Sequence, residues 1–348
     1  MAAQTNTDSG VPFYKIGTIG GKADAYISKE LFNEYKMKYS FPRKGEVMIT
    51  CAGTVGNCII YNGEDSYYQD SNIVWIDNPN EIITNEFLYH LLNKVNWSYL
   101  NSTTIVRIYN DDLRNLNLYT PQHDEQKKIT RLLSLTDERI ATQNKIIEDL
   151  KILKSAIIEK LFTRGGDAVL ISDLITQVSK RNNTDYNLPV LSVNNRLGFI
   201  RQSEQFEDRT VASDDTSNYK VVSADDFAFN PARINVGSIA RLKSETNGIV
   251  SPMYICFHTN DRVLPEYFEY FFETKYFYSE MQKRLEGSVR LCLSWEGLCN
   301  ISISLPNIEQ QIEIGKKIST IATKIDLEER YLQNLKLQKQ YLLQQMFI

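Results

Sequence analysis

The sequence predicts an α+β protein in which two similar mixed domains are separated by two long helices that pair as an antiparallel coiled coil. Three observations predict it. The chain repeats itself once, each half begins with short strand-like runs, and each half ends on a long segment with apolar residues at seven-residue spacing.

Length and composition indicate the general class of protein. The chain has 348 residues, 42% of them hydrophobic and 24% charged, which excludes disorder, collagen-like repeats and a disulfide scaffold. At about 150 residues per domain, this length predicts roughly two domains. A net charge of -4 argues against a uniformly basic protein but allows local basic patches. There is no apolar run of 18 residues and the start is polar, so we expect no membrane span, no signal peptide and a cytoplasmic location.

The internal repeat sets the order of domains. Its shift is 181 from Gly56 to Gly237, 180 a little further along and 185 from Pro121 onward. The paired segments are Gly45–Ile49 with Asp225–Phe229, Asp70–Ile76 with Val250–Cys256, and Pro121–Phe162 with Pro306–Phe347. We therefore expect a first domain at 1–120, a helix at 121–164, a second domain at 165–305 and a helix at 306–348.

The sequence of each domain predicts strands and short helices. Apolar or alternating runs bounded by Gly, Pro, Asn and Asp predict strands at 47–51, 57–61, 73–76, 190–193 and 253–258. Aromatic-rich segments at 86–93 and 266–274 predict a short helix in each domain. The second domain also has a lead-in, 168–187, before Leu188-Pro189, whereas ten residues precede Val11-Pro12. The first domain is therefore expected to lack its opening strand or helix.

The long helices have matched apolar seams. Between Asp124 and Phe162 there is no Pro or Gly. The seam positions are Leu133, Ile140, Ile147, Leu150, Ile157 and Leu161, and adding 185 gives Ile318, Ile325, Leu332, Leu335, Leu342 and Met346. A helix of 39 residues is about 58 Å long, more than one small domain can cover, so the two helices are expected to act as a spacer with one domain at each end.

Catalytic motifs are missing from the sequence. It contains no phosphate-binding loop, dinucleotide fingerprint, zinc-protease helix or nucleophile elbow. Its five cysteines form no Cys-x-x-Cys pair and its three histidines are far apart, so we expect neither a metal site nor catalytic residues.

Basic and amide side chains are the candidates for function, because Arg and Lys neutralise phosphates and Arg, Asn and Gln read base edges. In the first half, the candidates for DNA contact are Lys36, Lys38, Arg43, Lys44 and Arg107. In the second half they are Lys180, Arg181, Asn194, Asn195, Arg196, Arg233, Asn235, Arg241, Lys243 and Arg290.

This organisation resembles the specificity (S) subunit of type I restriction-modification systems, in which two target recognition domains alternate with two helices. The resemblance covers nearly the whole chain. It is carried by Pro121 with Glu125–Ile129, by Pro306 with Glu309–Gln311, by the closing Leu342–Phe347, and by Phe229–Ser238 with Gly248–Tyr254.

The resemblance implies a non-catalytic subunit that reads double-stranded DNA. Each recognition domain would bind one half of a bipartite site, and the helices would set the gap. Two modification (M) subunits carrying S-adenosylmethionine would methylate adenine, and restriction (R) subunits would use ATP and Mg for translocation and cleavage. This chain would hold no cofactor. Two alternatives stay open: an S-like scaffold or remnant that assembles without reading DNA, and a stand-alone DNA enzyme, against which the missing catalytic motifs weigh.

Overall fold

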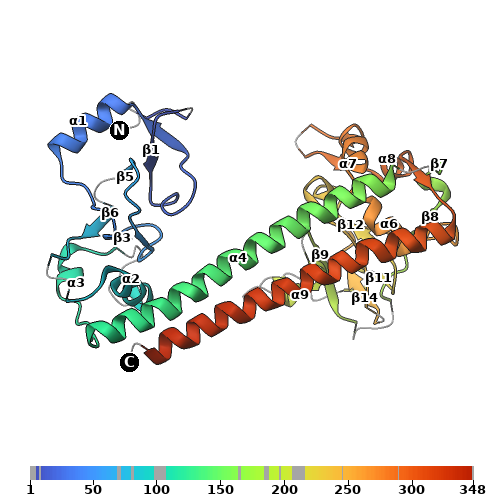
Figure 1. The fold of residues 1–348 in the computed structure, drawn as a ribbon. Helices are drawn as coiled ribbons and strands as arrows, with labels where there is room; N and C mark the ends of the chain where they lie inside the picture. Colours follow the sequence, from blue (N-terminus) through green and yellow to red (C-terminus); the bar gives the residue numbers. More distant parts are fainter. Residues whose placement is uncertain are drawn as a thin grey trace. The chain divides into compact units, whose positions relative to one another are not determined.

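The computed structural model describes residues 5–7, 9–68, 72–79, 82–97, 107–163, 166–183, 188–195, 197–205, 216–244, 246–288 and 290–346. It divides into two compact units (Figure 1). Unit 1 comprises Met1–Asn144 with Arg330–Ile348, and unit 2 comprises Lys145–Glu329. Each unit therefore contains one mixed α/β region together with part of both long helices.

Unit 1 has two three-stranded sheets. The first has the order β2 (Ala25–Ile27), β1 (Val11–Tyr14), β5 (Tyr67–Tyr68), and the second has the order β4 (Cys58–Ile60), β3 (Val47–Thr50), β6 (Ile73–Ile76). Its short helices are α1 (Lys29–Lys38), α2 (Asn85–Lys94) and α3 (Asn110–Arg114). Ser28 and Thr84 start α1 and α2, because each hydroxyl accepts a hydrogen bond from a first-turn N–H.

Unit 2 has two four-stranded sheets. One has the order β10 (Gly198–Arg201), β9 (Val190–Asn194), β14 (Gly248–Val250), β11 (Lys220–Val222), and the other has β13 (Ile239–Arg241), β12 (Phe227–Phe229), β15 (Ile255–Thr259), β8 (Ile175–Val178). Two small ladders pair β16 (Leu285–Glu286) with β17 (Cys292–Leu293), and β18 (Ser302–Leu305) with β7 (Asp167–Leu170). The helices are η3 (Ile171–Asp173), α5 (Gln202–Gln205), η4 (Ile234–Val236), α6 (Pro265–Phe271), α7 (Lys275–Gln282) and α8 (Trp295–Cys299).

The same topology occurs inside both units, as the repeat predicts. In unit 1, β1 is antiparallel to β2 and parallel to β5, and in unit 2, β9 is antiparallel to β10 and parallel to β14. The central strand β3 lies antiparallel between β4 and β6, just as β12 lies between β13 and β15. The lead-in of the second half adds β7 and β8 to unit 2, where they pair with β18 and β15.

An identical turn precedes the central strand of each unit. Gly45 has φ +92° and Asp225 has φ +67°, so both residues adopt the left-handed conformation. The carboxylate of the next residue, Glu46 or Asp226, accepts a 2.7 Å hydrogen bond from the backbone N–H three residues earlier. Both acids are buried. Two different sequences thus build one turn geometry, which confirms the alignment of these positions.

A buried glutamine ties the first long helix to the start of α2. The side chain of Gln126 accepts a hydrogen bond from Thr84 N at 2.8 Å, and its amide donates to Ile82 O and Pro121 O, both at 3.0 Å. It is 1% exposed. These three bonds satisfy backbone groups that would otherwise be buried without partners.

The second long helix repeats this arrangement. Gln311 accepts from Leu264 N at 2.8 Å and donates to Arg262 O at 3.0 Å and Pro306 O at 2.9 Å. Its three partners stand at the positions that the repeat assigns to the partners of Gln126. The pair of glutamines is therefore a structural signature of the repeat.

The long helices are α4 (His123–Phe162) and α9 (Ile308–Met346), and the predicted antiparallel pairing is confirmed within each unit (Figure 1). In unit 1, Leu133 packs in one cluster with Leu342, Leu343 and Met346, and farther along α4 the Asp137 carboxylate pairs with Lys339. In unit 2, Lys151 pairs with Glu329 at 2.6 Å, and the end of α4 packs with the first turns of α9. All twelve predicted seam positions are buried or half-buried.

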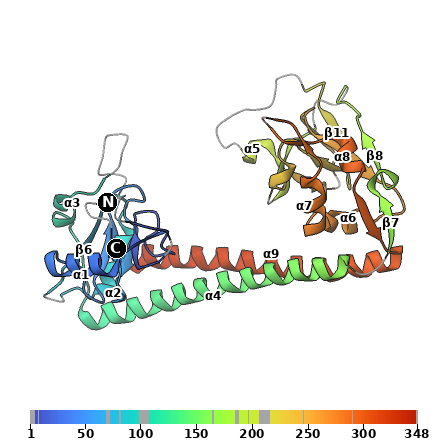
Figure 2. The same ribbon diagram turned by 90° about the horizontal axis from the view of Figure 1, so that it is seen from above.

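The main core of unit 2 lies on these helix ends (Figure 2). Ile158 and Leu161 of α4 and Ile318 of α9 pack with Phe268 of α6 and Phe277 of α7. The helix expected at 266–274 is shorter than predicted. It ends at Phe271, because the Thr274 hydroxyl accepts from Phe277 N at 3.1 Å and starts α7 instead.

Burial of His90 makes the stability of unit 1 depend on pH. His90 on α2 is 2% exposed, and burial lowers its pKa to about 4, with Lys339 adding to the effect and Asp137 opposing it. An unfolded imidazole has a pKa of about 6.5, so the unfolded chain binds more protons between these values. This contribution is fully present above about pH 6.5 and is lost as the pH falls towards 4, by about 3 kcal/mol.

Urea unfolding of unit 1 from pH 7 to pH 4.5 measures this dependence. The His90→Leu variant is expected to lose most of the slope, whereas His123→Gln, which changes an exposed histidine, is expected to keep it. An unchanged slope in His90→Leu would contradict the assignment.

No helix within the described residues is both long enough and apolar enough to cross a membrane.

Candidate nucleic-acid interface

The loop that follows β12 is closed at its base and presents its tip to solvent. Asn230 N donates to Ser238 O at 3.0 Å, and Ser238 N donates to Arg233 O at 3.1 Å. The Asn230 side chain accepts from Ala232 N at 3.1 Å, which fixes a turn directly after this strand. Gly237, with φ +88°, completes the loop. Arg233 is exposed, so this ordered loop presents its guanidinium to solvent and does not bury it in the core.

The turn between β9 and β10 lies against this loop. Leu197 N donates to the Asn194 side-chain oxygen at 3.1 Å, which shapes the turn. The Ser238 hydroxyl donates to the main chain of β9 at 3.3 Å. A Cβ atom at Gly237 would lie 3.6 Å from that of Asn195, so the two turns meet at their tips.

A third segment joins at the base of the same loop. Leu293 N in β17 donates to Pro231 O at 3.0 Å, which places the β16–β17 hairpin beside it. Arg290 lies at the tip of this hairpin, where Gly287 approaches the Arg290 carbonyl too closely to carry a side chain. Arg196, the remaining candidate of the β9–β10 turn, lies outside the described residues.

These three segments form what we call the loop surface of unit 2. It brings together Asn194, Asn195, Arg233, Asn235 and Arg290. Its rim also exposes large apolar side chains, with Leu197 73% and Met253 60% exposed. Exposed apolar groups beside amide and guanidinium groups are typical of a surface that reads base edges, because thymine methyl groups need apolar contacts.

Lys180 and Arg181 lie beside β11 and not on these three segments. Val221 N donates to Lys180 O at 2.8 Å, and the Arg181 guanidinium donates to the Asn218 side chain. Both side chains are exposed, so their charges face solvent on another part of unit 2.

Arg241 and Lys243 are engaged by carboxylates inside unit 2. Arg241 pairs with Asp225 at 2.7 Å and with Glu269 at 3.0 Å, and its side chain is 15% exposed. These ion pairs raise its pKa against the opposing effect of burial. Lys243 pairs with Glu269 at 2.9 Å. Arg241 therefore links β13 to α6 and is not part of the loop surface.

The equivalent loop of unit 1, residues 51–57, carries no Arg or Lys. Gly56 has φ +83°, like Gly237, but packs directly on Trp97. A charge is brought beside this loop by another segment, since Ile108 N donates to Cys51 O at 2.9 Å and positions Arg107 next to it. The Arg107 guanidinium lies over the Tyr109 ring at 5.7 Å.

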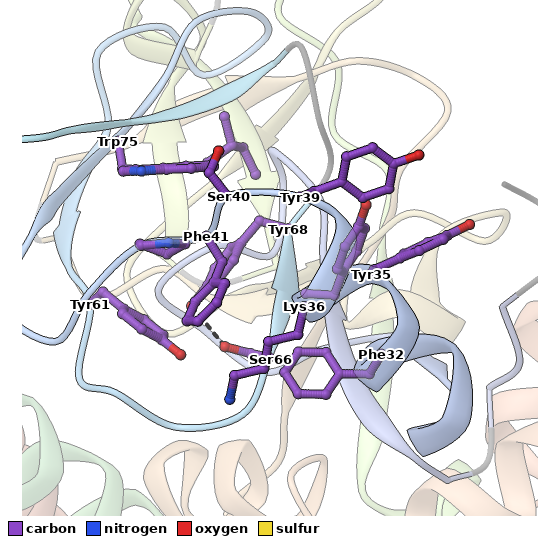
Figure 3. Close-up of a pocket in the computed structure, with 13 residues that line it drawn as sticks. Phe32, Tyr35, Lys36, Tyr39, Ser40, Phe41, Tyr61, Ser66, Tyr68 and Trp75 are labelled. Carbon is purple, nitrogen blue, oxygen red and sulfur yellow. Dashed lines mark hydrogen bonds between the residues drawn. The ribbon is translucent and has the colours of Figure 1, made fainter.

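One of the other four candidates of unit 1 contributes to the lining of an aromatic cavity (Figure 3). Lys36 lines it and pairs with Asp65 at 3.0 Å. Lys38 lies over the Tyr39 ring, and Arg43 and Lys44 are exposed just beyond the lining segment. Sequence reasoning found these cations but missed the cavity, although the density of aromatic residues between 32 and 75 was a signal for it.

Among the described residues, no three His, Cys, Asp or Glu side chains are grouped to hold a metal ion. All five cysteines are free.

Comparison with known proteins finds a likeness in the first part of the chain. Residues 2–151 match the family of the Type I restriction modification DNA specificity domain. A proposed type I restriction enzyme specificity subunit of Haemophilus influenzae is 46% identical over 149 residues, which cover 43% of this chain and 38% of that protein. The chain thus spans less than two fifths of that relative.

Two further comparisons extend the likeness beyond the specificity domain. The MjaVIII specificity subunit of Methanocaldococcus jannaschii is 23% identical over 297 residues, covering 75% of this chain and 68% of that protein. The crystal structure of the type I S subunit from M. genitalium matches with a TM-score of 0.58 at 16% identity, over 100% of this chain and 91% of that one. The chain resembles type I specificity subunits and has their fold.

Proposed function

We propose that this chain is the DNA-reading specificity subunit of a type I restriction-modification complex. The observation that carries the proposal is the loop surface of unit 2, where three separate segments bring three asparagines and two arginines together beside exposed apolar side chains. Arg is suited to guanine and Asn to adenine in the major groove. The specificity domain at 2–151 supports the same role for unit 1.

The division of labour follows from the repeat. Each unit would contact one half of a bipartite site, and the continuous helices α4 and α9 would set the gap between the halves. Within unit 1, Arg107 beside loop 51–57 would supply the charge that Arg233 supplies in unit 2. Lys180 and Arg181 would add phosphate contacts, which raise affinity without reading sequence.

Catalysis would belong to partner subunits. Modification subunits would carry S-adenosylmethionine and methylate adenine, and restriction subunits would use ATP and Mg. This chain would act in the cytoplasm without a cofactor of its own. The proposal is tested by sequencing duplexes retained from a random library by the chain with its modification subunit. Enrichment of two fixed half-sites is expected, and enrichment of no motif would contradict it.

The outward faces of the long helices are the proposed docking surface for modification subunits. On α4, the side chains of Leu132 and Leu135 in unit 1 and of Ile152 and Leu153 in unit 2 are exposed, although the helix already buries a seam against α9. Ile152 is 62% exposed. Apolar side chains in such number outside the seam favour a protein partner.

The joint variant Ile152→Asp with Leu153→Asp is expected to reduce co-purification of a tagged modification subunit at least about tenfold, because two charges would be buried at the contact. Ser155→Asp places a charge at an exposed polar position of the same helix and is expected to leave co-purification intact. If the unchanged chain, the joint variant and Ser155→Asp all recover the same amount of modification subunit, docking at this position is contradicted.

A further inference from the structure

The aromatic cavity of unit 1 is a formed site that the loops do not explain. It has a volume of about 380 Å³, and eight of the thirteen side chains that line it are aromatic (Figure 3). It lies where α1 and the segment 39–42 meet strands of both sheets of unit 1. Pockets of about 300–1,000 Å³ take small molecules, so this one is large enough for one planar ring system.

The walls are held from outside the cavity. The Tyr67 ring stacks on Phe13 at 5.8 Å, and the Tyr68 ring stacks on Tyr14 at 5.5 Å. Ser66 donates to the Tyr68 hydroxyl at 3.0 Å, and the Tyr61 hydroxyl donates to a backbone oxygen at 2.6 Å. Because these rings have partners on their far sides, the cavity is kept open by packing and hydrogen bonds.

Aromatic rings line the mouth, and basic residues flank its lining segment 39–42 in the sequence. Tyr39 and Phe41, which line it, are each about half exposed. The segment between them and β3 is anchored by the buried carboxylate of Glu46, which accepts from Arg43 N at 2.7 Å. Asp65 neutralises Lys36, but no ion pair is formed by Lys38, Arg43 or Lys44 with the described residues.

We propose that this cavity binds an unpaired nucleobase, with the adjoining phosphates near the basic residues that flank its lining segment, Lys38, Arg43 and Lys44. Every base offers two π-faces to aromatic walls, and proteins that hold unstacked bases combine such rings with cations along the backbone. An aliphatic or acidic ligand would not use both features. The inference deepens the proposed function, because it assigns unit 1 a contact with nucleic acid that a paired duplex cannot make.

The test uses the full chain and two duplexes of one random sequence, either fully paired or with a single bulged 2-aminopurine. The bulged duplex is expected to bind about tenfold to hundredfold more tightly, as stacking of one base gives. The fluorescence of the bulged 2-aminopurine is expected to fall on binding, because this base is quenched when it is stacked. Joint replacement Tyr39→Leu with Phe41→Leu is expected to abolish both effects.

Controls separate this inference from the proposed function. Tyr119→Leu, at an exposed tyrosine that does not line the cavity, is expected to keep the preference for the bulge. Circular dichroism verifies that the leucine variants fold. Equal affinity for both duplexes, or a preference that survives the joint variant, overturns the cavity inference and leaves the proposed function standing. Binding of the bulged duplex alone supports the cavity inference, and binding of neither duplex contradicts it. The proposed function is tested apart from this, on duplexes enriched from the library, because a random sequence need not contain the recognised site.

Discussion

Replacing Arg233 by alanine is expected to weaken binding of the recognised duplex about tenfold to hundredfold. A bidentate contact between arginine and a base edge contributes about 1–3 kcal/mol of discrimination, and Arg233 is the exposed guanidinium on the tip of the β12 loop. The loop backbone is closed by hydrogen bonds of Asn230 and Ser238, so the substitution is expected to leave its shape unchanged. Filter binding against the enriched duplex and a scrambled one measures the loss.

Arg262→Ala is the matched control for Arg233→Ala. Arg262 is also exposed in unit 2, but its backbone lies next to Gln311 and not on the loop surface. Its removal takes away the same charge. Because salt screens a charge that lies away from the DNA, this variant is expected to change the affinity for both duplexes less than about threefold. If the two variants lose affinity equally, Arg233 contributes only net charge and its assignment as a base reader is wrong.

Gln311→Leu is expected to lower the free energy of unfolding of unit 2 by about 3–4 kcal/mol. The replacement leaves three buried backbone groups without partners, those of Leu264, Arg262 and Pro306, at about 1 kcal/mol or more each. Urea unfolding followed by circular dichroism measures the change. Gln310→Leu alters an exposed neighbour whose side chain forms none of these bonds, and it is expected to change stability by less than about 0.5 kcal/mol.

Gln126→Leu is expected to have the same effect on unit 1, because Gln126 makes the same three bonds. A loss below about 1 kcal/mol for either glutamine would show that the backbone groups find other partners, and would contradict their role as the joint between short and long helices.

The repeat and the helices could be predicted because their signals are local or periodic. Leu133 and Ile318 stand in seven-residue series, and both are fully buried as core seam positions should be. The repeat also aligned Gly45 with Asp225, but only the structure reveals that both residues are left-handed and begin the same turn.

The candidate site could be predicted only in part, because exposure of a charge depends on partners distant in sequence. Arg233 and Arg241 look alike in the sequence, being separated by eight positions around one loop. In the structure, Arg241 pairs with Glu269 on α6, while Arg233 has a free tip. No local pattern distinguishes them. The aromatic cavity was missed for the same reason, since its walls come from α1 and from both sheets.

The central claim is that this chain selects DNA sequence for an adenine methyltransferase. It is tested most directly by co-expressing the chain with its modification subunit and mapping methylated adenines across the host DNA at single-base resolution, with Arg233→Ala beside it. A split motif with two fixed halves and a constant gap is expected, with relaxed specificity in one half for Arg233→Ala. No chain-dependent methylation from a stable, purified complex would contradict the claim and favour an assembly scaffold.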